Sequence, residues 1–111
     1  MKTSEMQGFA LDWAVMAAEG GEWSGKLLSD GTLVTYTGRL PITTRLWAAG
    51  GPIIERERIH LAHSHFKGHW VAFIANSDCG NVFGPTPLVA AMRCYVASKL
   101  GNEVEVPEEM K

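Results

Sequence analysis

The residues best suited to binding a charged ligand surround a Gly50-Gly51-Pro52 turn near the middle of the chain. Arg45 and Trp47 precede this turn, and Arg56 follows it. If Pro52 opens a helix, the unpaired backbone N–H groups at that helix start form an anion site, and arginine side chains can reach the same ligand. The pattern therefore predicts ligand-binding roles for Arg45, Trp47, Gly50, Gly51 and Arg56.

A second helix start is predicted at Thr86-Pro87. Threonine followed by proline is typical of an N-cap and a first helical residue, so the main role expected of Thr86 is to cap a helix. Because this helix start also exposes backbone N–H groups, Thr86 is a further candidate ligand-binding residue. Neither helix start matches a phosphate-binding loop or a dinucleotide fingerprint.

Four histidines fall within ten residues: His60, His63, His65 and His69. On a strand, His63 and His65 would share one face and His60 would lie on the other, and the cluster contains no Cys, Asp or Glu. Zinc needs three or four convergent ligands. We therefore expect a polar hairpin tip, with no metal and no other cofactor.

Common catalytic motifs are missing from the sequence, which contains no Ser-His-Asp frame, no recognisable carboxylate pair and no H-E-x-x-H. Cys79 and Cys94 are too few for a disulfide framework or a four-cysteine zinc site. They are expected as reduced thiols, with Cys94 buried inside a helix. We therefore expect a binding protein and not an enzyme.

Two segments show helical periodicity. In the first, apolar residues recur at i, i+4, i+7 and i+8, and they are Phe9, Trp13, Met16 and Ala17. Either a Ser4–Gln7 capping box or Gly8 begins this helix, and Gly20-Gly21 ends it. The second helix begins after Thr86, has Lys99 in its last turn and is capped by Gly101; its apolar face is Leu88, Met92, Tyr95 and Val96.

Strand-like segments lie between the two helices. Thr32–Thr37 is rich in β-branched residues, and Ile59–His63 and Trp70–Ala75 are predicted to form an antiparallel hairpin. Val82-Phe83 is a shorter strand candidate. Pro52–Glu57 is compatible with a helix or a strand, and the helix is favoured. Gly38–Gly51 shows no clean period and is predicted to be a long irregular loop.

Composition places these elements in one small folded domain, residues 1–111, with a solvated tail from about 103 to 111. The chain has 46% hydrophobic and 20% charged residues and a net charge of −2, which argues against disorder and against a basic nucleic-acid-binding surface. We expect an α+β fold: an N-terminal helix, an antiparallel sheet of three or four short strands, a short central helix and a C-terminal helix packed on the sheet. No membrane span or signal peptide is predicted, so a cytoplasmic location is expected.

Three stretches in matching order resemble the NinX-like family of accessory proteins from lambdoid bacteriophages and prophages. They are Ala10–Gly20, Trp47–Glu57 and Gly84–Lys99. This sequence departs from the family pattern by placing Arg45 where the family tends to have an acid. The resemblance implies a protein made in the host bacterial cytoplasm, in a family of unknown function.

The leading functional hypothesis is capture of a small anionic ligand, such as a nucleotide-type signal of host anti-phage defence. The alternative is an inhibitor that docks on a host protein through exposed aromatics such as Trp23 and Trp47. A small nucleotide-acting enzyme ranks third, and nucleic-acid binding last. A homo-oligomer is expected because a chain this short buries a modest share of its surface.

Overall fold

The computed structural model describes residues 1–19, 26–27, 33–35, 38–39, 47–64, 69–75, 77 and 80–106. At Phe9 and in the three short segments between 26 and 39, it describes the backbone alone. Three α-helices are present in this part of the chain: α1 (Gly8–Ala18), α2 (Trp47–Glu57) and α3 (Pro87–Leu100). A short 3-10 helix, η1 (Thr3–Glu5), precedes them.

The main sheet has the order β4-β5-β6 and is antiparallel throughout. β4 (Ile59–His63) pairs with β5 (Trp70–Ile74) from Ile59 opposite Ile74 to His63 opposite Trp70, which confirms the predicted hairpin. β6 (Val82–Gly84) adds to the other side of β5. Alternate residues of these strands therefore face α3, and the others face outward.

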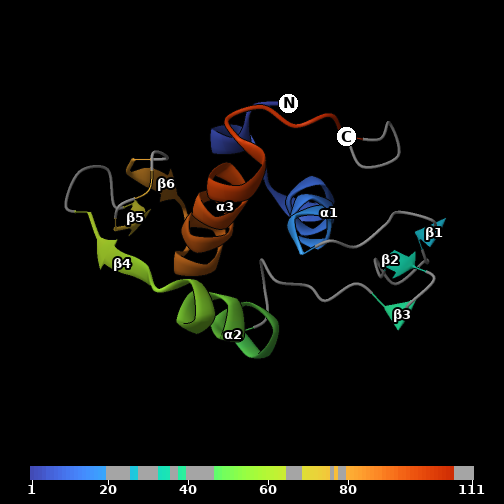
Figure 1. Cartoon of the computed structure of the whole chain (residues 1–111), viewed down its shortest axis with the longest axis horizontal. Helices are drawn as coiled ribbons and strands as arrows, with labels where there is room; N and C mark the ends of the chain where they lie inside the picture. Colours follow the sequence, from blue (N-terminus) through green and yellow to red (C-terminus); the bar gives the residue numbers. More distant parts are fainter. Residues whose placement is uncertain are drawn as a thin grey trace.

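The C-terminal helix α3 is the centre of the molecule. It lies between the main sheet and α1, with α2 against its side (Figure 1). Leu88, Met92, Tyr95 and Val96 are buried as predicted, but so are Val89, Ala90, Ala91 and Cys94. A helix that is apolar on nearly all sides is covered on nearly all sides, and this is the position that α3 occupies.

Helix α1 begins at Gly8, and its buried face differs from the predicted one. Met16 is buried as expected, but Trp13 and Ala17 are only partly buried. The core also includes Ala10, Leu11, Ala14 and Val15, which the prediction left out, and Trp13 packs against it. The predicted face was incomplete because α1 is apolar around most of its circumference, so periodicity alone could not identify all the residues that meet the core.

A second, smaller sheet precedes α2. β1 (Lys26–Leu27), β2 (Leu33–Thr35) and β3 (Gly38–Arg39) pair antiparallel in that order. Of the expected strand Thr32–Thr37, the described residues Leu33–Thr35 form β2, in a sheet separate from β4-β5-β6. The three antiparallel strands of the main sheet confirm the predicted sheet of three or four strands, and the smaller sheet is an addition that the sequence did not indicate.

Helix α2 begins at Trp47, earlier than predicted. The expected helix was Pro52–Glu57 and the expected loop was Gly38–Gly51, but β3 and the first turns of α2 occupy parts of that loop. Pro52 lies inside α2. Pro52 has no N–H to donate to the Ala48 carbonyl, and its ring is crowded against that carbonyl; burial of Gly50 and Ile53 favours the helix despite this cost.

The first residues of the chain lie beside the segment that follows α3. Lys2 forms a β-bridge with Glu103, and the Met1 ammonium group donates to the Val104 carbonyl at 2.9 Å. Val106 is buried in the core. Within the tail that was predicted to be solvated from about residue 103, Glu103 and Glu105 are exposed, Val104 is partly buried and Val106 is buried; residues 107–111 lie outside the described part. None of the described helices is long and apolar enough to span a membrane.

Candidate functional site

The structure places four of the predicted ligand-binding residues on α2: Trp47, Gly50, Gly51 and Arg56. Trp47 is the first residue of this helix, and its side chain is 54% exposed. Gly50 is buried and Gly51 partly buried, one turn further along. The first turn of α2 therefore lies at Trp47 and the residues after it, about one turn earlier than the predicted helix start at Pro52. Arg45 lies outside the described residues.

Arg56 lies at the opposite end of α2, nine positions after Trp47, which is a rise of about 13 Å. Its Nε donates to Glu57 Oε2 at 2.9 Å, and Nη2 donates to Glu19 Oε1 at 2.9 Å and to the Tyr95 hydroxyl at 3.2 Å. Lys99 Nζ lies 3.3 Å from Glu57 Oε1. Arg56 thus joins the ends of α1 and α2 to α3.

The side chains that contact Arg56 have shifted pKa values. The hydrogen bond from Arg56 lowers the pKa of Glu57, with a further contribution from Lys99. Burial raises the pKa of Tyr95 to about 12, and the nearby Glu19 carboxylate adds to the effect. Two acids and two cations are paired here, so an incoming anion would have to compete with Glu19 and Glu57 for Arg56.

Thr86 caps α3 as predicted. Its Oγ1 accepts a hydrogen bond from the Val89 N–H at 3.1 Å, and Pro87 is the first helical residue. Arg56 contacts α3 at Tyr95, nine residues beyond Thr86. The structure therefore does not bring Thr86 together with Arg56.

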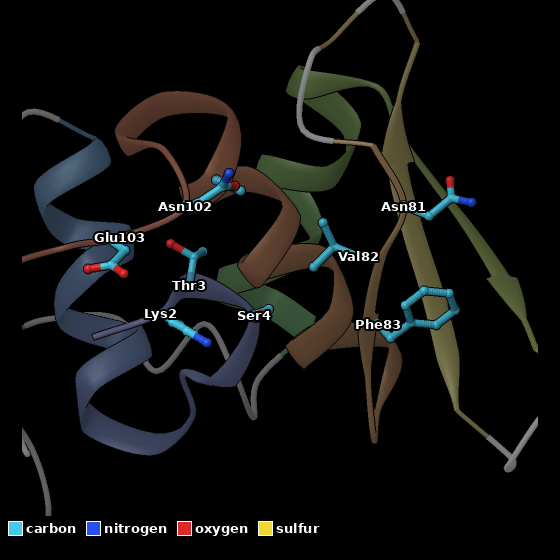
Figure 2. Close-up of a pocket in the computed structure, with 9 residues that line it drawn as sticks. Lys2, Thr3, Ser4, Asn81, Val82, Phe83, Asn102 and Glu103 are labelled. Carbon is cyan, nitrogen blue, oxygen red and sulfur yellow. The ribbon is translucent and has the colours of Figure 1, made fainter.

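A groove of about 300 Å³ lies where η1, β6 and the end of α3 meet. Its polar lining residues are Lys2, Thr3, Ser4, Asn81, Asn102 and Glu103. Figure 2 shows Val82 pointing into the groove, whereas Asn81 and Phe83 point to the other side of β6. Thr3 Oγ1 already donates to the Gly101 carbonyl at 2.7 Å, so part of the polar lining serves to hold the two ends of the chain together.

Sequence reasoning missed an exposed surface with two aromatic rings on the main sheet. We call it the outward face: His60, Ala62, Val71, Phe73 and Phe83, on the side of the main sheet opposite α3. Phe83 is 48% exposed and Phe73 36%, and the His60 ring stacks on Phe73 with centroids 4.6 Å apart. The signal was present in the sequence, because β4 and β5 carry apolar residues on both faces instead of one.

The described histidines lie in different surroundings. His60 lies on the other face of β4 from His63, as expected. His63 contacts the edge of the Trp70 ring, with centroids 5.1 Å apart. His65 lies outside the described residues. Within the described part of the chain, no three His, Cys, Asp or Glu side chains are grouped as metal ligands. Cys94 is buried as predicted, and Cys79 lies outside the described part.

Comparison with protein families gives a match over most of the chain. The model of a family described as "Bacteriophage P22, NinX" matches residues 2–99, which covers α1, α2, the main sheet and nearly all of α3. No curated protein matches the chain.

Proposed function

The chain belongs to the NinX family of bacteriophage P22, and from this premise we propose that it is a phage accessory protein that binds a host protein through its outward face. We place this activity in the cytoplasm of the host bacterium. Family membership supports the accessory role, and the protein-binding activity is our inference from the exposed aromatic side chains of β5 and β6.

The observation that carries the proposal is the pair of exposed rings on neighbouring strands. Phe83 lies directly opposite Val71, and Phe73 follows two residues later on the same face, so the two rings are diagonal neighbours. Aromatic residues are enriched where protein interfaces are fully buried, and they supply much of the binding energy. If Phe73 and Phe83 stayed exposed to water with no partner protein, this binding energy would not be gained.

The charge pattern agrees with this role. β4, β5 and β6 contain no Asp, Glu, Lys or Arg at all. The central part of a protein interface is depleted of charge in the same way. The outward face also offers no carboxylate or thiol, and its one titratable side chain, His60, stacks on Phe73.

The test compares tagged wild-type protein with a Phe73→Ser/Phe83→Ser variant in pull-downs from host lysate. Trp47→Ser is the matched control, because it removes from α2 an aromatic that is more exposed than Phe73 or Phe83. We expect one stoichiometric host protein with wild type and with the control, and an affinity for that purified protein at least ~30-fold weaker for the double variant. Circular dichroism checks that each variant is folded. Equal affinities for the double variant and the wild type would overturn the proposal.

A second candidate function is capture of a small anionic, nucleotide-type ligand at the start of α2. The observation in its favour is the exposed Trp47 beside the N-terminal N–H groups of α2, two residues after Arg45. Calorimetry against a panel of nucleotides and cyclic nucleotides tests it, with Trp47→Ala and Arg45→Gln expected to abolish the heat of binding. Turnover in the same panel would indicate a nucleotide-acting enzyme instead.

A further inference from the structure

The groove between η1 and β6 is lined on one side by the backbone of a sheet edge. Asn81 and Phe83 both border the groove, yet Figure 2 shows their side chains pointing to the other side of β6. It is therefore the backbone of these two residues that faces the groove. The side chain of Val82 points into it, and Ala97 of α3 also lines it, so the groove has an apolar wall.

One backbone N–H group at this edge has no partner among the described residues. The Ser64 N–H donates to the His69 carbonyl at 2.7 Å, and the alternation that continues from this pair along the hairpin makes Val71 bond to β4. Val71 and Phe83 are therefore a non-hydrogen-bonded pair, and the N–H and C=O groups of Phe83 point away from β5. Arg93 Nη1 donates to this carbonyl at 2.9 Å, whereas no described residue accepts from the Phe83 N–H.

A cationic side chain borders the same groove. Figure 2 shows the Lys2 ammonium group directed toward Ser4. In the part of the chain that the structure describes, this ammonium group has no ion pair and no hydrogen bond. Glu103 supplies a carboxylate to the described lining, but Figure 2 shows this carboxylate pointing away from Val82. The groove thus combines an available cation, an available N–H donor and an apolar wall.

We propose that the groove binds the carboxyl-terminal end of an extended peptide. A backbone carbonyl near the end of the peptide accepts from the Phe83 N–H, as it does when a peptide adds to the edge of a sheet. The terminal carboxylate binds the Lys2 ammonium group, and a small apolar last side chain packs on Val82 and Ala97. The proposal does not depend on the outward face binding a host protein.

The available groups favour a peptide end over a longer strand or an inorganic anion. Because Arg93 already binds the Phe83 carbonyl, a strand that ran along β6 would find a donor at Phe83 but no free acceptor. A volume of about 300 Å³ lies at the lower end of the range for small-ligand sites, which suits a short peptide end. An inorganic anion would leave the apolar wall unused.

Nuclear magnetic resonance titration with N-acetyl-alanyl-valine tests the proposal. The dipeptide is compared in two forms, one with a free carboxylate and one with a terminal amide. We expect the free acid to shift the Phe83 amide signal, and the terminal amide to bind about tenfold more weakly. Equal affinities, or no binding at millimolar peptide, would overturn the proposal. Acetate that binds as tightly as the peptide would show a site for any small carboxylate and would also overturn it.

Two substitutions of Phe83 test the backbone donor. Phe83→Pro and Phe83→Ser both remove the ring, but only proline also removes the N–H, and a sheet edge tolerates proline where that N–H points outward. We expect the peptide to bind the proline variant about tenfold more weakly and the serine variant with wild-type affinity. Circular dichroism checks that both variants are folded. Equal peptide affinities of the two folded variants would contradict the proposal.

A pair of lysine variants tests the cation independently. Lys2→Gln should weaken binding of the free acid about tenfold, whereas Lys99→Gln removes a cation from α3 outside the groove and should not. Unchanged affinity in Lys2→Gln would overturn the proposal, whether or not Phe83→Pro folds. Because Phe83→Ser removes a ring of the outward face and keeps the groove donor, this test and the pull-down can fail separately.

Discussion

At the scale of single residues, polar atoms decide where the helices begin and end. The Thr86 hydroxyl satisfies one of the N–H groups that a helix start leaves unpaired, and Gly101 ends α3 with a positive φ of 90° that favours glycine. Both positions could be predicted from the sequence, because capping depends on the residue itself and its immediate neighbours.

Loss of the Thr86 cap should destabilise the protein without changing its fold. Thr86→Ala removes the acceptor for the Val89 N–H and should lower the free energy of unfolding by about 1 kcal/mol. Thr86→Ser keeps an oxygen in the same place and should lose much less. Urea denaturation measures both variants. Equal losses would show that the methyl group of Thr86, and not its hydroxyl, contributes the stability.

Tyr95 makes stability depend on pH in the alkaline range. Its pKa is raised from 10.0 to about 12, chiefly by burial, so the folded protein keeps the phenolic proton over a range in which the unfolded chain has lost it. This contribution is complete below pH 10 and is lost as pH rises from 10 to about 12. The ultraviolet absorbance of the phenolate, followed in a Tyr36→Phe variant, should titrate near pH 12. A midpoint near 10 would contradict the prediction.

At the scale of elements, the close approach of β6 to α3 depends on glycine. A Cβ built on Gly84 would lie 2.6 Å from the Ala90 backbone N and 2.9 Å from its Cα. The last residue of β6 therefore packs directly against the first turn of α3, and backbone atoms cannot move aside as a flexible side chain could. Sequence patterning identified both elements but not this contact.

Two glycine substitutions should have opposite effects. Gly84→Ala forces β6 and α3 apart and should lower the free energy of unfolding by roughly 1–3 kcal/mol. Gly51→Ala lies within α2, where a Cβ meets nothing within 4 Å, and should raise it by up to ~1 kcal/mol through helix propensity. Thermal unfolding compares the two. A stabilised Gly84→Ala variant would show that β6 does not lie this close to α3.

At the scale of the whole molecule, two arginines connect distant parts of the chain in different ways. Arg93 is half-buried and binds the backbone carbonyls of Met6 and Phe83, and burial lowers its pKa. Arg56 is largely exposed and binds carboxylates. The first joins the N-terminal segment and β6 to α3, and the second joins the ends of α1 and α2.

Replacing each arginine by methionine should show how much each kind of contact contributes to stability. Arg93→Met leaves two carbonyls without their donor in a partly buried place and should cost about 2–3 kcal/mol. Arg56→Met breaks exposed ion pairs and should cost less than about 1 kcal/mol, an amount that salt reduces further. Urea unfolding at low and high salt provides the comparison. A larger loss for Arg56→Met would contradict this ranking.

Local and periodic features could be predicted from the amino-acid sequence alone: the cap of α3 at Thr86, the hairpin of β4 and β5, the buried face of α3 and the α+β class. Each follows from a residue and its near neighbours, or from a period of two or 3.6 residues. Family membership could be anticipated for the same reason, from short stretches in matching order.

Other features depended on contacts between distant segments. Three such features are the buried face of α1, the start of α2 at Trp47 and the pairing of Lys2 with Glu103. Each is set by other segments that pack against it, and no local sequence pattern shows which segments those are. The candidate residues of the Gly50-Gly51-Pro52 turn were close in sequence, yet the rise of α2 separates Trp47 from Arg56. Conversely, Phe73 and Phe83 come from different strands, and strand pairing brings them onto one outward face.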